Sequence, residues 1–193
     1  MARRATIEDD DLICKLTDVF RNVGYEGASL AVLAQATGLK KASLYHRFPG
    51  GKEQMAEEVF KAAEAWLGDN VLAPLKSGAP PAERLRAMID RLNAFYGGGK
   101  QACLLNTLAS AHLGDGPFAR RIRRAFKLWI DAIAAALTDA GLDDDTARAR
   151  AQRAVMMIQG SLVLSRGLGT TKPFRDALAA LPDELLGNLR DAM

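Results

Sequence analysis

Cysteine is scarce in this chain of 193 residues, which contains only Cys14 and Cys103, far apart and without a CxxC spacing. A disulfide framework and a cysteine–histidine metal site are therefore not expected. Long apolar runs are also missing, because no stretch approaches the roughly 20 residues that cross a bilayer. With neither a membrane span nor a secretory signal in view, we expect a cytoplasmic protein with reduced thiols that does not contact membranes.

Catalytic motifs are missing as well. The sequence has two histidines and contains no HExxH, no GxSxG, no P-loop and no dinucleotide-binding fingerprint. Gly97-Gly98-Gly99-Lys100 lacks the spacing of a P-loop and follows a predicted helix. We expect no enzyme, no cofactor and no bound metal. The open alternatives are a binding protein that recognises DNA and a helical bundle that binds only other proteins.

The residues that are abundant indicate an all-α fold, because alanine and leucine dominate and the apolar spacing is helical. In the first expected helix, which Thr6 caps and Gly24 ends, the apolar stripe extends from Leu12 to Val23. Pro74 is expected to end the helix that starts near Lys52. The further expected helices are 29–37, 41–48, 81–96, 104–112, 117–140, 145–167 and one or two short helices in 171–192 broken near Pro182.

The stretch 28–53 reads as two short helices broken at Thr37-Gly38, and from Ala28 to Lys52 it contains four Lys or Arg side chains and no acid. Lys40 and Lys41 fall at the N-terminus of the second of these helices. The helix dipole disfavours cations there by roughly 0.3–1 kcal/mol each, and nearby phosphates would reverse that sign. A helix-turn-helix with a basic second helix is typical of major-groove DNA recognition, whereas a merely solvated basic turn is the alternative.

The pattern of residues 6–55 resembles the tetracycline-repressor (TetR) family of DNA-binding regulators. The residues that carry the resemblance, in order and with the family's spacing, are Gly24-Tyr25, Ala28-Ser29-Leu30, Leu33-Ala34, Gly38-Leu39, Ser43-Leu44-Tyr45-His46, Phe48 and Lys52-Glu53. The turn at 49–54 is similar to the LmrA/YxaF-like subgroup, and Ala102-Cys103-Leu104-Leu105 fits that subgroup too.

The resemblance implies the DNA-binding residues. Its phosphate-contacting positions correspond to Ser29, Tyr45, His46 and Lys52, and the base-facing part of its recognition helix to Lys41, Ala42 and Ser43. Lys40 replaces the family's usual serine cap, and Arg47 replaces a common histidine or tyrosine. Both departures preserve or raise the basic charge and leave the preferred DNA sequence open.

The resemblance also implies an N-terminal three-helix DNA-binding domain, residues 1–51, and a C-terminal helical domain for ligand binding and dimerisation, residues 52–193. The helix expected at 145–167 supports a homodimer, because apolar residues extend well around it and a second copy of the chain would cover one face. The alternative is an ordinary central core helix. The residues expected in the dimer interface are Met156, Met157, Gly160, Val163 and Leu164.

We therefore expect a homodimeric transcriptional regulator that represses at a palindromic operator of double-stranded DNA and is released by a small apolar or aromatic molecule. Apolar and aromatic walls with a few polar groups suit such a ligand, although for each aromatic taken alone an ordinary place in the core is the favoured alternative. The candidate ligand-binding residues are Trp66, Phe95, Cys103, Asn106, His112, Phe126, Trp129 and Gln159. An activator and a redox-responsive regulator that uses Cys103 are the alternatives.

Overall fold

All regular structure in the described part of the chain is helical. The computed structural model describes residues 8–109 and 115–187, and no strand lies within these ranges, so the predicted all-α class is confirmed. The helices are α1 (Asp9–Gly27), α2 (Leu30–Thr37), α3 (Lys41–Arg47), α4 (Gly51–Leu67), α5 (Ala73–Leu75), α6 (Pro81–Phe95), α7 (Leu104–Thr107), α8 (Ala119–Asp139), α9 (Asp144–Leu168) and α10 (Lys172–Leu186), with a π-helical turn η1 (Gly68–Leu72) and a 3-10 turn η2 (Gly97–Gly99).

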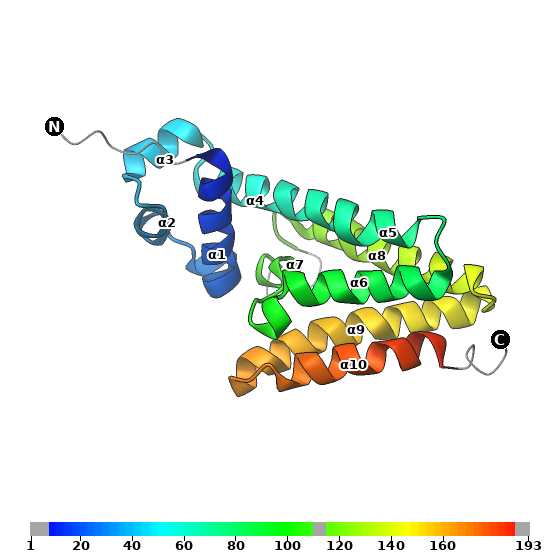
Figure 1. Cartoon of the computed structure of the whole chain (residues 1–193). Helices are drawn as coiled ribbons and strands as arrows, with labels where there is room; N and C mark the ends of the chain where they lie inside the picture. The colour runs from blue at the N-terminus through cyan, green and yellow to red at the C-terminus, as the bar shows by residue number, and fades with distance from the viewer. Residues whose placement is uncertain (1–7, 110–114, 188–193) are drawn as a thin grey trace.

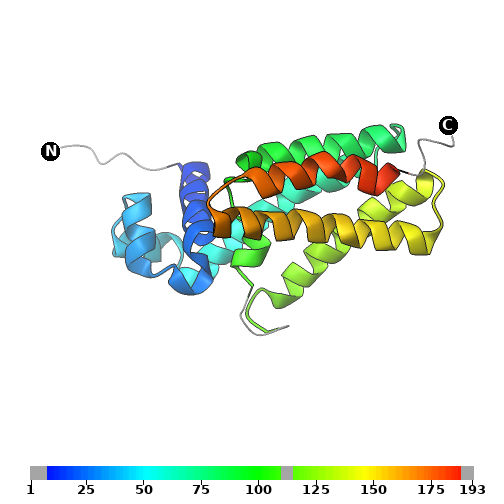
Figure 2. The same cartoon turned by 90° about the horizontal axis from the view of Figure 1, so that it is seen from below.

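The molecule has a small and a large group of helices. Helices α1, α2 and α3 cluster at the end of the molecule where the N-terminus lies, and α4 runs from this cluster along the larger group (Figure 1). The long helices α9 and α10 lie side by side in both views (Figures 1 and 2). Helix α4 therefore belongs to both groups and joins them covalently.

The small group is held by the apolar stripe of α1, of which Leu12, Leu16 and Phe20 are almost fully buried. The predicted membership of Val23 in this stripe is wrong, since 47% of its surface is exposed. The backbone leaves helical geometry at Gly24 (φ 71°, ψ 179°), directly after Val23. Thr6, the expected cap, lies outside the described residues.

Proline affects two helices differently. The helix that begins near Lys52 continues through η1 into α5 and ends at Leu75, one residue after Pro74, so the prediction that it ends at Pro74 is confirmed to within one residue. The predicted break near Pro182 is wrong, because Pro182 lies inside one continuous helix, α10. A proline inside a helix costs about 3 kcal/mol, and burial of Leu178, Leu181 and Leu185 on the core offsets that cost.

The helix expected at 104–112 is shorter, since α7 ends at Thr107; His112 lies outside the described residues. The inner face of α9 packs on the core, with Ala151, Val155, Ile158 and Leu162 all buried.

Candidate DNA-binding surface and effector cavity

The turn between α2 and α3 is built by local hydrogen bonds. Ser29 caps α2, where its Oγ accepts a hydrogen bond from the Val32 amide at 3.3 Å. Gly38 ends α2 in the left-handed conformation (φ 70°), which glycine adopts without the steric cost of a side chain. Leu33 of α2 and Leu44 of α3 are fully buried, so they fix how α3 is presented.

The outer face of α3 is basic and exposed. Lys40, Lys41, Ala42, Tyr45 and His46 are exposed, and Ser43 is half-buried. Lys40 occupies the N-cap and makes no side-chain capping hydrogen bond. The first orphan amides of α3 and two lysines therefore meet at one end of this helix, an arrangement that favours phosphate oxygens.

Lys52 makes contacts that the sequence did not predict. Its ammonium donates a hydrogen bond to the Tyr25 carbonyl oxygen at 3.0 Å and lies 4.2 Å from the centroid of the Tyr25 ring. Lysine has three N–H donors, so two are left for a phosphate. Lys52 thus ties α4 to the end of α1, and its expected phosphate contact stays a prediction.

The large group contains a small apolar cavity of about 30 Å³. Trp66, Phe95, Cys103 and Trp129 line it, together with Tyr96. The Trp66 and Phe95 rings are stacked with their centroids 3.7 Å apart. This volume holds only about one or two water molecules, so a ligand of ordinary size has to part these walls.

Among the described residues, three other expected ligand residues, Asn106, Phe126 and Gln159, do not line the cavity. Asn106 is exposed, Phe126 is half-buried, and Gln159 packs beside the Tyr96 hydroxyl without a well-formed hydrogen bond. Tyr96 was not among the predicted ligand residues, although it follows the buried Leu92 of α6 by one helical turn and that spacing could have identified it. Complete burial raises the pKa of the Tyr96 phenol well above its ordinary value.

One polar group of the cavity wall lacks a partner. The indole N–H of Trp129, a residue that is 1% exposed, has no hydrogen-bond partner among the described residues. The acid in the lining, Glu64, is already paired with Arg121 of α8. A buried donor without an acceptor is costly. A ligand with an acceptor oxygen would therefore bind more tightly if that oxygen accepted a hydrogen bond from the Trp129 indole N–H.

The two cysteines are both unpaired, with Cys14 exposed and Cys103 buried. Burial restricts the access of oxidants to the Cys103 thiol. Among the described residues no group of three His, Cys, Asp or Glu side chains is placed to hold a metal ion. No helix within the described ranges is long and apolar enough to cross a membrane.

The outer face of α9 is apolar. Met156, Val163 and Leu164 expose more than half of their surfaces, Gly160 lies between them in the exposed stripe, and Met157 is half-buried. Large apolar side chains that gather in one exposed patch mark an interaction surface.

Comparison with known proteins decides the family. Residues 16–59 match the family described as bacterial regulatory proteins, tetR family, and residues 81–180 match the transcriptional regulator LmrA/YxaF-like C-terminal domain. The chain belongs to the TetR family of transcriptional regulators. It is therefore a DNA-binding regulator of transcription, and such regulators are not enzymes.

Relatives of this regulator include two proteins of Bacillus subtilis. It is 25% identical to the HTH-type transcriptional regulator LmrA over 181 residues, 91% of this chain and 95% of LmrA. It is 25% identical to YxaF over 150 residues, 76% of this chain and 78% of YxaF. It is 26% identical to the repressor KstR2 of Mycolicibacterium smegmatis over 141 residues, 70% of this chain and 68% of KstR2.

Solved structures share the fold. A TetR regulator from Legionella pneumophila superposes with a TM-score of 0.78 at 19% identity, covering 94% of this chain and 99% of that one. CifR, solved as a cysteine mutant with a 26-bp operator, superposes with a TM-score of 0.69 at 22% identity, covering 93% of this chain and 98% of CifR.

Proposed function

We propose that this regulator is a homodimeric repressor that binds a palindromic operator through α3 and is released by a small apolar or aromatic molecule. The observation that carries the DNA-binding part is the exposed face of α3, where Lys40 and Lys41 lie against the helix dipole. The DNA contacts are proposed for Ser29, Lys40, Lys41, Ala42, Ser43, Tyr45, His46 and Lys52. Residues 1–51 form the DNA-binding domain in this proposal, and residues 52–193 form the ligand-binding and dimerisation domain of a cytoplasmic protein.

The dimer is proposed to form through the outer face of α9. Met156, Gly160, Val163 and Leu164 recur at intervals of three and four residues, so they form one stripe along the helix. Glycine in this stripe permits the close approach of a second helix. A dimer built on this face presents two copies of α3, as a two-fold symmetric operator requires.

The ligand is proposed to enter between Trp66 of α4 and Phe95 of α6. Ligand pockets typically measure about 300–1,000 Å³, far more than the 30 Å³ of this cavity. A ligand therefore favours a conformation in which the two rings are apart, and it shifts the equilibrium by its differential affinity for that conformation. Since α4 starts at Gly51, directly behind α3, separation of α4 from α6 changes how α3 is held.

Release can be tested with uncharged bicyclic aromatics such as 2-naphthol as probes. A compound that occupies the cavity should raise the melting temperature in the absence of DNA and weaken operator binding in fluorescence anisotropy. Trp66→Ala should abolish both effects, whereas Trp66→Phe should keep a stacked wall and retain them. Compounds that bind through Trp66 and leave operator affinity unchanged would refute ligand release.

A further inference from the structure

Arg21 is a charged side chain of α1 that is buried inside the large group of helices. Only 8% of its surface is exposed, and its Nη1 donates a hydrogen bond to the Gln101 side-chain oxygen. Its Nε has no hydrogen-bond partner among the described residues. Burial lowers the pKa of the guanidinium. Burying a charge is costly, yet this arginine extends from the DNA-binding cluster into the domain behind it.

The guanidinium lies against a wall of the effector cavity. Its central carbon is 4.6 Å from the centroid of the Phe95 ring. Trp66 covers Phe95 with a centroid separation of 3.7 Å, which leaves no room for a guanidinium on that face, so Arg21 uses the opposite face. Trp66, Phe95 and Arg21 therefore form a three-layer stack that joins α4, α6 and α1.

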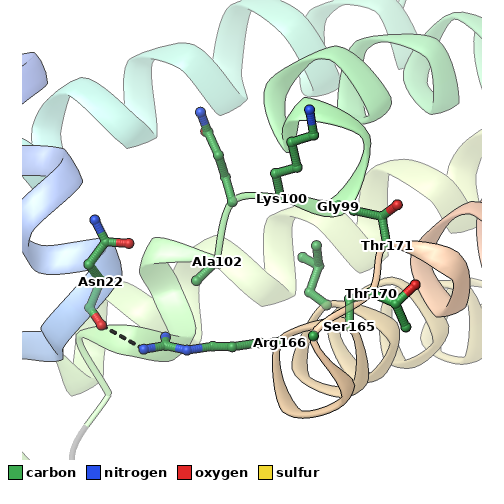
Figure 3. A pocket seen from close by; sticks show the side chains of 11 residues that line it. Asn22, Gly99, Lys100, Ala102, Ser165, Arg166, Thr170 and Thr171 are labelled. Atoms are coloured by element: carbon green, nitrogen blue, oxygen red, sulfur yellow. Dashed lines mark hydrogen bonds between the residues drawn. The ribbon is translucent and has the colours of Figure 1, made fainter.

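The backbone of α1 is clamped at the same place. Arg166 of α9 donates hydrogen bonds to the carbonyl oxygens of Arg21 at 3.3 Å and of Asn22 at 2.6 Å. Figure 3 shows the Arg166 guanidinium reaching across to Asn22. Beyond this clamp the chain kinks at Gly24 and continues to Ser29, the cap of α2. A shift at Arg21 is therefore passed to the helix-turn-helix through a few residues.

We propose that Arg21 is the positioning residue that couples the state of the Trp66–Phe95 wall to the DNA-binding helices. This inference rests on the proposed function and adds its route of regulation. A ligand that displaces the Phe95 ring removes the face on which the guanidinium rests. The buried charge then follows the ring or seeks water, and in either case α1 moves relative to α4.

A double-mutant cycle tests this coupling without a known ligand, because Phe95→Leu alters the wall by itself. Operator affinity is measured for wild type, Phe95→Leu, Arg21→Met and the double variant, on DNA selected by the wild-type protein. Phe95→Leu should change operator affinity by at least about five-fold when Arg21 is present, the lower range of typical allosteric coupling. It should change affinity by less than about two-fold in the Arg21→Met background, the usual limit of additivity.

Arg84 provides a matched control. It is an equally buried arginine whose hydrogen bonds go to the Leu75 carbonyl oxygen and to Asp139 and not to the Trp66–Phe95 wall. Phe95→Leu should therefore have the same effect with Arg84→Met as in wild type. An equal effect of Phe95→Leu in the wild-type and Arg21→Met backgrounds, or no effect in either, would overturn the proposal.

If Arg21→Met does not fold, Arg21→Lys replaces it in the double-mutant cycle, because lysine keeps the charge but lacks the planar group that covers a ring. If wild-type protein selects no DNA, the proposed function fails by itself, and hydrogen exchange of residues 28–47 replaces affinity in the same variants. Phe95→Leu should then change the hydrogen-exchange rates of residues 28–47 only in proteins that retain Arg21. A change that does not depend on Arg21 would overturn the coupling.

Discussion

At the scale of single residues, the start of α3 is shaped for a partner at some cost to folding. Lys40 and Lys41 place two positive charges where the dipole of α3 is already positive, and Lys40 leaves the N-cap without a side-chain acceptor. Each charge disfavours the helix by about 0.3–1 kcal/mol. Nearby DNA phosphates would make the interaction of these charges favourable. Removal of the two lysines should therefore weaken DNA binding without lowering the stability of the fold.

Replacement of both lysines, Lys40→Ala/Lys41→Ala, should weaken operator binding without lowering thermal stability. Each lost phosphate contact should also reduce the slope of log affinity against log salt concentration by about 0.9. Fluorescence anisotropy at several salt concentrations and thermal melting measure the two effects. Lys61→Ala, which removes an exposed lysine paired with Glu58 on α4, should leave the salt slope unchanged. An unaltered slope in the double variant would remove α3 from the DNA contact.

Gly99 should tolerate no side chain, because a Cβ there would lie 2.7 Å from the Phe174 Cβ. Its backbone also has a φ of 95°, which strains any other residue. Gly141 has a similar φ of 100° but open space around it. Gly99→Ala should therefore lower the free energy of unfolding by about 1–3 kcal/mol more than Gly141→Ala, the usual cost of overpacking. Urea denaturation measures both, and equal losses would contradict this packing at η2.

At the scale of helices, sequence patterns predicted the elements well and their contacts poorly. The buried face of α9 follows from the helical spacing of its apolar residues, and the break after α2 follows from the backbone preference of Gly38, so both were predictable. The continuity of α10 through Pro182 depends on leucines that meet other helices, and the sequence alone does not contain that information.

The candidate site shows the same division. The exposed cations of α3 were predictable because their environment is water or DNA. Two contacts of the site join elements that are distant in the chain: the hydrogen bond from Lys52 to the Tyr25 carbonyl oxygen and the stacking of Arg21 on Phe95. Local periodicity carries no signal for such pairs, so neither contact could be predicted.

The N-terminus of α9 should make stability depend on pH. Asp143 caps this helix, and the hydrogen bond from the Thr146 amide lowers the pKa of its carboxyl group. A lowered pKa in the folded state stabilises the fold above the ordinary value of about 3.9. That contribution is lost as the pH falls through the folded pKa.

Asp143→Asn keeps a capping oxygen but does not titrate. Its melting temperature should therefore fall less steeply than that of wild type as the pH is lowered from about 5 to below 3.9. Asp145→Asn, which changes an exposed acid in the first turn of the same helix, is the control. Parallel melting curves for wild type and Asp143→Asn would show that the cap does not contribute.

At the scale of the whole molecule, the regulator combines a basic exposed face, a small apolar cavity and an exposed apolar stripe. The first lies on α3, the second between α4, α6 and α8, and the third on α9. Helix α4 and the Arg21 stack connect the first two, and in the proposed dimer the exposed apolar face of α9 brings two copies of α3 together. Repression and release in the proposed function require all three.

Charged residues introduced into the exposed apolar stripe of α9 should prevent formation of the proposed dimer. Val163→Glu/Leu164→Glu should convert a dimer into a monomer, because two buried carboxylates without partners cannot be accommodated in an interface. Operator affinity should fall by roughly 100-fold or more, as linked binding to two half-sites is lost. Sedimentation and anisotropy measure the two effects. Leu128→Glu, on the partly exposed face of α8, should change neither, and a monomeric wild type would contradict the stripe's role.

Selection of binding sites from random double-stranded DNA by the wild-type protein tests the central claim most directly. A dimer with two copies of α3 should enrich inverted repeats whose half-sites are centred about 10 bp apart, or a multiple of that distance. Enrichment should be lost in Lys40→Ala/Lys41→Ala. Recovery of single, non-repeated sites, or no enrichment at all, would contradict the account of a paired DNA-binding repressor.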